Sequence, residues 1–178
     1  NVFDNITARA ITDDEIARFD RIYQGVDFGW YPDPFAFLRM HYDVAHETLY
    51  FIDEHRSNKT SNADNAAWIK ERGYDDFPVV CDSAEPKSVA DLRASGLDAR
   101  NAIKGPGSVE YGMKWLQCRR IVIDPARTPE AYKEFINYEY EREKDGNVIS
   151  GYPDKDDHFI SAARYGMERT FRLYGVRA

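Results

Sequence analysis

RIYQGVDF, residues 21–28, begins a group of three strand-like runs that lie close together in the chain. The other two are Phe35–Tyr42 and Thr48–His55, and all three are rich in the β-branched and aromatic residues that favour strands. The connections between them are short and polar, so they leave no room for a crossover helix. We therefore predict an antiparallel three-stranded meander.

Beyond the meander, helical patterns alternate with short apolar strands. Strands are predicted at residues 77–81, 97–103 and 120–123. Helices are predicted at 62–72, 86–95, 108–118, 128–140 and about 156–174, with Ser108 as the cap of its helix. Asp145-Gly146-Asn147 indicates an extra β-hairpin before the last helix. This order predicts an α/β fold in which a mixed sheet, antiparallel at first and then parallel, is flanked by helices.

The start of the chain suggests where the domain begins. Residues 1–20 are polar and start at Asn1, so we expect them to be a lead-in from a missing preceding domain, with the folded domain at 21–178. No apolar run approaches the ~20 residues that a membrane helix needs, and no signal segment opens the chain. We therefore expect no membrane partner.

Composition excludes several classes of function. The net charge of −7 is unlike that of a simple nucleic-acid binder, which is usually basic. It is compatible with a metal-dependent enzyme, because clustered carboxylates repel one another until cations bind. Cys81 and Cys118 have no CxxC spacing, which argues against a zinc site or a disulfide framework, and both are expected to be small buried residues. The chain also contains no P-loop motif and no GxSxG motif.

Three aspartates stand at positions that favour chemistry. Asp27 ends the first strand, on the face that it shares with Gly25. Asp82 directly follows a short apolar strand, and the carboxyl ends of such strands are where α/β sheets bind ligands. Asp157 begins the last helix at the edge of its apolar stripe. Each also has a plain structural interpretation, as a turn cap, a helix entry or an acid favoured by the helix dipole.

Together these acids indicate a metal site. Asp27, Asp82 and Asp157 would form an oxygen-rich pocket, and Mg²⁺ and Mn²⁺ prefer oxygen ligands. Two such ions about 4 Å apart clamp the attacking water and the leaving oxygen of a phosphodiester. We therefore predict that the three aspartates are catalytic metal ligands for two divalent cations.

Other polar residues carry weaker signals. His158 is a second-choice metal ligand, because a helical wheel directs it away from the buried stripe. His41, His46 and His55 are expected to have surface or structural roles. Lys104, in the loop Lys104-Gly105-Pro106-Gly107, and Lys87 are predicted to contact the DNA backbone. Tyr111, Met113 and Trp115 are expected to be core residues.

Several motifs form a joint pattern. They are GVDFG (25–29), VCDSAEPKS (80–88), AIKG (102–105) followed by Ser108 and Leu116-Gln117, and DDH (156–158) leading to AARY (162–165). Over about residues 20–170 this pattern resembles the C-terminal nuclease domain of tailed-phage terminase large subunits, of the type found in headful-packaging Bacillus phages.

The resemblance implies an RNase H-like fold and endonucleolytic cutting of concatemeric double-stranded phage DNA during genome packaging. It implies Mg²⁺ or Mn²⁺ as cofactors, and Asp27 and Asp82 as the first two metal-binding acids. It also implies an N-terminal ATPase domain in the same full-length chain, a terminase small subunit and a portal protein as partners, and action in the host cytoplasm.

The third acid departs from a common pattern. Many relatives read Asn-His-x-x-Asp-Ala at the last helix, whereas this chain reads Asp157-His158-Phe159-Ile160-Ser161-Ala162. The acid has therefore moved one helical turn earlier on the same side of the helix. We take Asp157 as the third ligand.

Two other functions stay open on the sequence. One is a junction resolvase or transposase-like nuclease of the same fold, which selective cutting of DNA junctions would reveal. The other is a non-catalytic domain that docks DNA or the portal, and its stability would not respond to millimolar metal.

Overall fold

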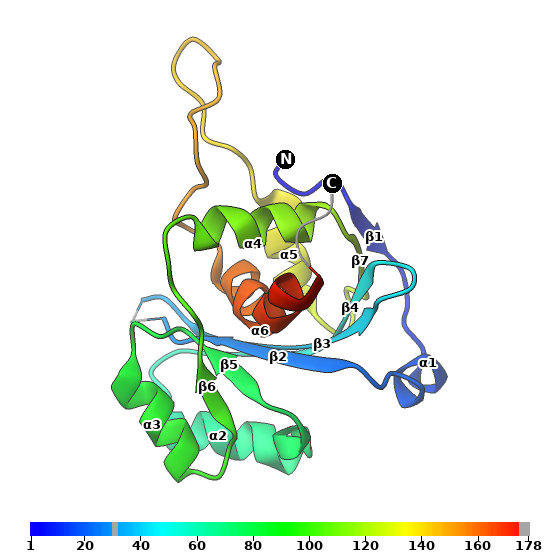
Figure 1. The fold of residues 1–178 in the computed structure, drawn as a ribbon, viewed down its shortest axis with the longest axis vertical. Coiled ribbons are helices and arrows are strands. Elements are labelled where there is room, and N and C mark those ends of the chain that lie inside the picture. The colour runs from blue at the N-terminus through cyan, green and yellow to red at the C-terminus, as the bar shows by residue number, and fades with distance from the viewer. Residues whose placement is uncertain (30–31, 175–178) are drawn as a thin grey trace.

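The computed structural model of the chain describes residues 1–29 and 32–174. Residues 175–178, the end of the predicted domain, lie outside the described residues. One mixed sheet has the strand order β1-β7-β4-β3-β2-β5-β6 (Figure 1). Its strands are β1 (Ile6–Ala8), β2 (Ile22–Asp27), β3 (Phe35–Asp43), β4 (Thr48–Ser57), β5 (Val79–Cys81), β6 (Ala99–Asn101) and β7 (Arg120–Ile123). The helices are α1 (Asp13–Ala17), α2 (Asn62–Glu71), the 3₁₀ turn η1 (Tyr74–Asp76), α3 (Pro86–Ala94), α4 (Ser108–Gln117), α5 (Pro129–Asn137) and α6 (His158–Tyr174).

Strand directions confirm the predicted fold class. β2, β3 and β4 pair antiparallel in chain order, as the meander requires. β5 pairs in parallel with β2, β6 with β5, and β7 with β4. The later strands are therefore added in parallel to both edges of the meander.

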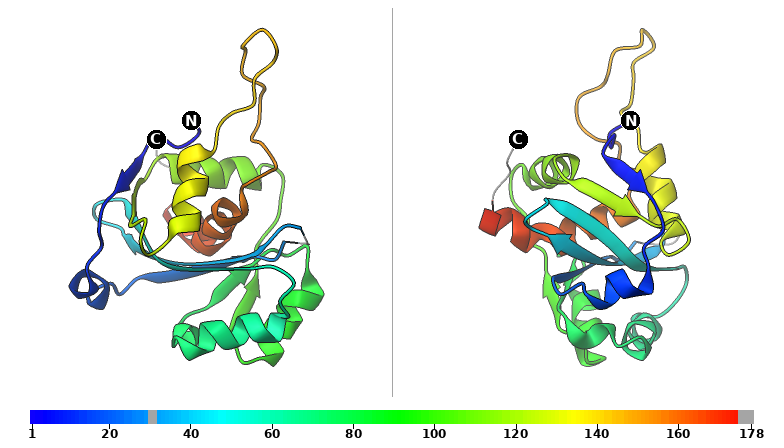
Figure 2. Two further views of the ribbon diagram at one scale, coloured as in Figure 1. Left: turned by 180° about the vertical axis from the view of Figure 1, so that it is seen from behind. Right: turned by 90° about the vertical axis from the view of Figure 1, so that its right-hand side faces the viewer.

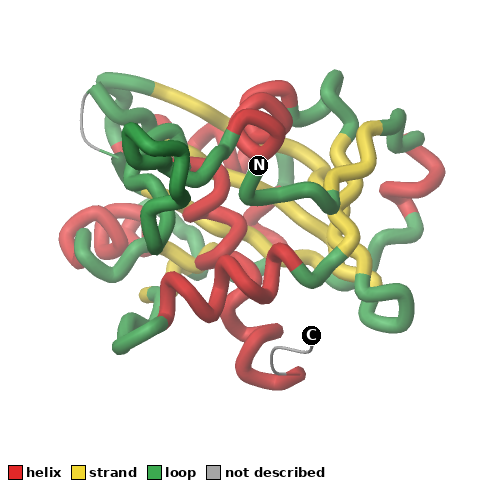
Figure 3. Tube along the Cα trace, turned by 90° about the horizontal axis from the view of Figure 1, so that it is seen from above, coloured by secondary structure: helices red, strands yellow, loops and turns green. Residues whose placement is uncertain are grey.

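Helices cover both faces of the sheet. α4, α5 and α6 lie on one face, while α2 and α3 lie on the other (Figures 1 and 2). Viewed from above, the first group lies across the strands (Figure 3). Alternation along β3 separates the two cores, because Leu38 and Met40 pack toward α6 whereas Phe37 packs toward α2. The meander is thus buried on both sides.

The start of the chain corrects the predicted boundary at residue 21. β1 pairs in parallel with β7 at the edge of the sheet, and Val2 and Phe3 are buried in the core beside α5. Residues 1–20 are therefore part of the folded unit. The sequence pattern for this strand is weak, because β1 has three residues, of which Thr7 and Ala8 are exposed.

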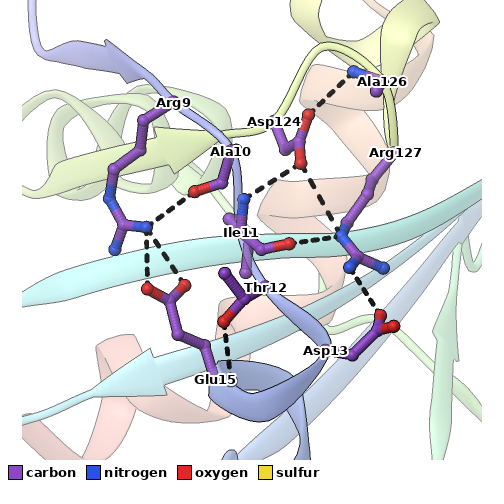
Figure 4. A network of polar contacts seen from close by, with 9 residues as sticks. All are labelled: Arg9, Ala10, Ile11, Thr12, Asp13, Glu15, Asp124, Ala126 and Arg127. Carbon is purple, nitrogen blue, oxygen red and sulfur yellow. Dashed lines mark hydrogen bonds and ion pairs between the residues drawn. The ribbon is translucent and has the colours of Figure 1, made fainter.

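A polar network fixes the same segment to the end of β7 (Figure 4). Asp124 accepts a hydrogen bond from the backbone N–H of Ile11 at 2.9 Å, and Arg127 donates to the Ile11 carbonyl at 2.8 Å. Arg127 also pairs with Asp13 at 2.7 Å. These bonds hold the connection between β1 and α1 against the domain.

Three local predictions need correction. Ser108 does not cap α4 as predicted, because it is the first residue of the helix. The cap position is Gly107, whose left-handed backbone (φ 74°) turns the chain into the helix without a side-chain hydrogen bond. Tyr111 is 44% exposed because it faces outward from α4, whereas Met113 and Trp115 are buried as expected. Cys118 is exposed because it lies just past the end of α4, whereas Cys81 is buried in β5.

The segment before α6 projects from the body of the protein (Figures 1 and 2). Its hairpin has a single antiparallel bridge, between Arg142 and Val148, and the Asn147 carbonyl accepts from the Glu143 N–H at 2.8 Å. α5 ends at Asn137, earlier than predicted, because Tyr138 adopts extended backbone and its hydroxyl bonds to the carbonyl of Pro153. Tyr138 and Pro153 thus close the base of this loop.

Glu54 on β4 holds the start of α5. Its two carboxylate oxygens accept hydrogen bonds from the backbone N–H groups of Ala131 and Glu130, at 2.9 and 3.1 Å. Burial raises the pKa of Glu54 from 4.5 to about 7, although these bonds oppose the shift. Folding therefore favours the protonated form of Glu54. The free energy of unfolding falls as the pH rises from 4.5 through about 7, because the folded protein must then hold the charged form.

Glu54→Gln is expected to remove this pH dependence. Because Glu54 is partly exposed, we discount the shift and expect wild type to lose about 1–2 kcal/mol relative to the variant between about pH 4.5 and pH 8. Thermal melts of both proteins at the two pH values measure the difference. A constant difference between them at all pH values would contradict an ionising Glu54.

No helix in the described residues is both long enough and apolar enough to cross a membrane.

Candidate metal centre

Two of the predicted acids lie side by side at the ends of neighbouring parallel strands. Val26 of β2 pairs with Cys81 of β5, and the next residues are Asp27 and Asp82. The Asp82 backbone N–H donates to the Val26 carbonyl at 3.2 Å, which fixes this register. Both side chains are mostly buried, with 16% and 19% of their surface exposed.

α6 crosses β2 at very short range. A Cβ atom placed on Gly25 would lie 1.8 Å from the carbonyl oxygen of Ala162, and one placed on Gly166 would lie 3.0 Å from the Gly25 nitrogen. Glycine on both elements allows this approach. The start of α6, with Asp157 and His158, is thereby brought to the carboxyl end of β2.

One cavity of about 620 Å³ collects the three predicted ligands. Asp27 and Asp82 line it from the sheet, and Asp157 lines it from the start of α6. Asp33, Glu85 and Asp154 add further carboxylates to the same lining. A pocket so rich in acids is unfavourable without bound cations, because like charges at short range repel.

A lysine and a histidine of the protein contact three of these acids. Lys104 Nζ is 2.9 Å from Asp82 Oδ1. His158 Nδ1 is 3.5 Å from Asp27 Oδ2, and its Nε2 is 3.6 Å from Asp33 Oδ1. The hydrogen bond to Asp27 is the largest cause that raises the pKa of His158. The helical wheel places His158 away from the buried stripe of α6, yet from the first residue of this helix its ring reaches Asp27 of β2.

Asp157 lies directly before α6 and is half-buried. Burial, with the nearby charges of Asp154 and Asp27, raises its pKa to about 6. Its backbone carbonyl accepts from the Ser161 N–H at 2.8 Å, so the residue starts the helix. Its carboxylate receives no hydrogen bond from the N–H groups of the first turn among the contacts described. The Ile160 N–H, which an aspartate at this position could accept, donates to Glu134 instead.

Within residues 1–29 and 32–174, no three His, Cys, Asp or Glu side chains are grouped closely enough to hold a metal ion. The acids thus share a cavity without forming a closed ligand cluster. The contacts of Lys104 and His158 provide a physical reason, since each neutralises a carboxylate that would otherwise need a cation. Asp27, Asp82 and Asp157 line the same cavity, and carboxylate oxygens are the type of donor that divalent cations prefer.

The two predicted DNA-binding lysines have different surroundings. Lys104 is about half-exposed, lines a neighbouring cavity and is paired with Asp82. Lys87 is exposed in the first turn of α3 and is absent from the lining of that cavity. Neither lysine lines the acid cavity, but Lys104 contacts one of its acids, Asp82.

The sequence reading missed two acids. Asp33 is 63% exposed at the rim of the cavity, and its place in a Pro-Asp-Pro turn gave no sign of it. Glu134 accepts a hydrogen bond from the Ile160 N–H at 2.7 Å, and burial raises its pKa to about 8. A signal for Glu134 existed, because it lies next to buried Phe135 on the inner side of α5.

Comparisons with known proteins agree with this fold. Residues 27–169 match the family model described as the Terminase RNAseH like domain. The large terminase subunit of Bacillus phage SPP1 is 44% identical over 169 residues, which are 93% of this chain and 40% of that protein. The PBSX phage terminase large subunit of Bacillus subtilis is 29% identical over 145 residues, 81% of this chain and 33% of that protein. The chain thus spans less than half the length of these relatives.

Solved structures extend the likeness to three dimensions. The nuclease domain of the SPP1 large terminase, solved with bound Mn, is 43% identical and superposes with a TM-score of 0.90, covering 94% of this chain and 98% of that one. The P22 large terminase nuclease domain has the same fold at 19% identity, with a TM-score of 0.69 over 96% and 92% of the two chains. By its sequence match and its RNase H-like architecture, the chain belongs to the terminase RNase H-like domain family.

Proposed function

We propose that the chain is a metal-dependent endonuclease that cuts double-stranded DNA. The observation that supports this most is the convergence of Asp27, Asp82 and Asp157 on one cavity. The relation to a nuclease domain that was solved with bound Mn adds independent support. Several carboxylates around one cavity suit hydrolysis of a phosphodiester by bound cations better than acyl transfer.

The proposed cofactors are two divalent cations, Mg²⁺ or Mn²⁺, held by Asp27, Asp82 and Asp157. When bound, they supply an activated water and neutralise the charge that develops on the leaving 3′ oxygen. The protein needs no nucleophile of its own. Its three aspartates bind and orient, and Asp33 is a further oxygen donor at the rim.

The cationic side chains have proposed roles around this centre. Lys104 pairs with Asp82 while that carboxylate has no other cation. Once Asp82 binds metal, the ammonium is positioned to contact a phosphate of the DNA backbone. We propose that His158, between Asp27 and Asp33, keeps the Asp27 carboxylate oriented. A role as a metal ligand is the second choice for this residue. Lys87 would contact DNA farther from the cut.

The full-length protein has a wider proposed role. We propose that it cuts concatemeric phage DNA as packaging begins and ends, in the cytoplasm of the host. Its proposed partners are an N-terminal ATPase domain in the same chain, a terminase small subunit and a portal protein. The support is family membership, together with the length of the relatives that lies outside the match.

Cutting of supercoiled plasmid tests the activity. We expect nicked and linear products in millimolar Mn²⁺ and none when EDTA is present, with little preference for sequence. Thermal melts in the same buffers should show stabilisation by Mn²⁺, because a ligand that binds the folded state stabilises it. A four-way junction and a linear duplex of equal length are cut in parallel, and strong preference for the junction would favour a resolvase. Neither cutting nor stabilisation at any Mn²⁺ concentration would overturn the proposal and favour a docking domain.

A further inference from the structure

The start of α6 is capped by a residue from another helix. An aspartate directly before a helix ordinarily accepts a hydrogen bond from the N–H of the second or third helical residue. Here the third N–H, from Ile160, donates to Glu134 of α5 at 2.7 Å. The second, from Phe159, lowers the pKa of the Glu134 carboxylate, which places this N–H near it. Glu134 thus takes the Ile160 N–H, one of the two groups that the Asp157 side chain would otherwise use.

We propose that Glu134 is a positioning residue, which caps α6 in place of Asp157 and so leaves the Asp157 carboxylate for the metal site. The inference rests on the proposed function, since it concerns the third ligand of that centre. It explains how one acid can stand at the start of a helix and still face a ligand. The two acids divide the tasks of capping and binding.

Burial and position separate Glu134 from the acid cavity. Its side chain is largely buried, and it lines a neighbouring cavity of about 710 Å³ beneath the loop that precedes α6. Asp157 lines the acid cavity and is absent from the neighbouring one. The two carboxylates therefore approach the start of α6 from different sides, which makes Glu134 a support rather than a ligand.

The start of α5 is also capped by a glutamate from another element. Glu54 of β4 accepts the N–H groups of Glu130 and Ala131 at the start of α5. The sheet therefore holds α5, and α5 in turn holds the start of α6 through Glu134. Two partly buried glutamates thus link the sheet to the residue that precedes α6, Asp157.

The inference predicts how metal affinity responds to Glu134. In Glu134→Ala the Asp157 carboxylate gains the free N–H groups as partners, and metal must compete with them. Mn²⁺ affinity, measured by titration calorimetry without DNA, should fall by about tenfold, the equivalent of about 1.4 kcal/mol. Glu134→Gln should stay close to wild type, since its side-chain carbonyl still accepts the Ile160 N–H. Glu134→Met, which has no acceptor but keeps the volume, repeats the test if the alanine variant fails to fold.

A double-mutant cycle separates positioning from general damage. In an Asp157→Ala background, Glu134→Ala should still lower the melting temperature but should cause no further loss of Mn²⁺ affinity. A crystal structure of Glu134→Ala without metal gives a second readout, in which a carboxylate oxygen of Asp157 should lie within hydrogen-bond distance of the Ile160 nitrogen.

Three results would overturn the inference. One is unchanged Mn²⁺ affinity in Glu134→Ala, and another is an unmoved Asp157 in its structure. The third is an equal loss of affinity in Glu134→Gln, which would make Glu134 a ligand. Failure of the proposed function looks different, because wild type itself would then bind no Mn²⁺ and cut no DNA.

Discussion

Asp27→Ala should abolish Mn²⁺-dependent cutting of plasmid DNA while leaving the fold intact. Asp27 ends β2 beside Asp82, and His158 Nδ1 lies 3.5 Å from its carboxylate. Metal ligands of this kind contribute several kcal/mol to stabilisation of the transition state. A loss of about 4 kcal/mol corresponds to a rate about a thousandfold lower.

Initial rates of plasmid cutting at saturating Mn²⁺ measure this effect. Asp14→Ala is a matched control, since it removes the same charge from an exposed site in α1. Circular dichroism spectra and melting temperatures should be near wild type for both variants. Asp27→Ala should also lose most of its stabilisation by Mn²⁺. Cutting by Asp27→Ala within about tenfold of wild type would show that Asp27 is not a ligand of the reactive centre.

Gly25→Ala is expected to destabilise the protein strongly, although it adds only one methyl group. The added Cβ would lie 1.8 Å from the Ala162 carbonyl oxygen and 2.8 Å from the Gly166 nitrogen, which are both backbone atoms of α6. Backbone cannot rotate away as a side chain does, so β2 and α6 must separate. We expect a loss of about 3 kcal/mol or more, at the upper end of overpacking effects. For a domain of this size that corresponds to a fall in melting temperature of roughly 10 °C.

Gly105→Ala is the matched control for this substitution. Its Cβ would meet no atom within 4 Å, and it lies in the loop next to Lys104. Thermal denaturation followed by circular dichroism should show a large shift for Gly25→Ala and almost none for Gly105→Ala. Equal melting temperatures for Gly25→Ala and wild type would contradict the close contact between β2 and α6 that positions Asp157.

Strong local patterns made much of the fold predictable. The alternation along residues 21–55 gave the meander, and the short apolar runs gave β5 and β7. Asp27 and Asp82 were accessible to the same reasoning because a strand end is a local feature. Their adjacency then follows from the parallel pairing of β2 with β5.

Features that depend on a distant partner escaped prediction. β1 exists because β7 offers it an edge, and three residues carry too little pattern to reveal that pairing. A helical wheel places His158 away from the buried stripe, because it represents one helix alone and includes no neighbouring strand. In the fold, Asp27 at the end of β2 lies within reach of the His158 ring. Likewise, whether Asp157 caps α6 or faces the cavity is decided by Glu134, which lies on a different helix.

Diffraction from crystals soaked in Mn²⁺, recorded at a wavelength where manganese scatters anomalously, tests the account most directly. We expect two peaks about 4 Å apart, with carboxylate oxygens of Asp27, Asp82 and Asp157 at about 2.2 Å and Lys104 moved off Asp82. A peak bound elsewhere, or no peak at saturating Mn²⁺ with Lys104 still on Asp82, would contradict it.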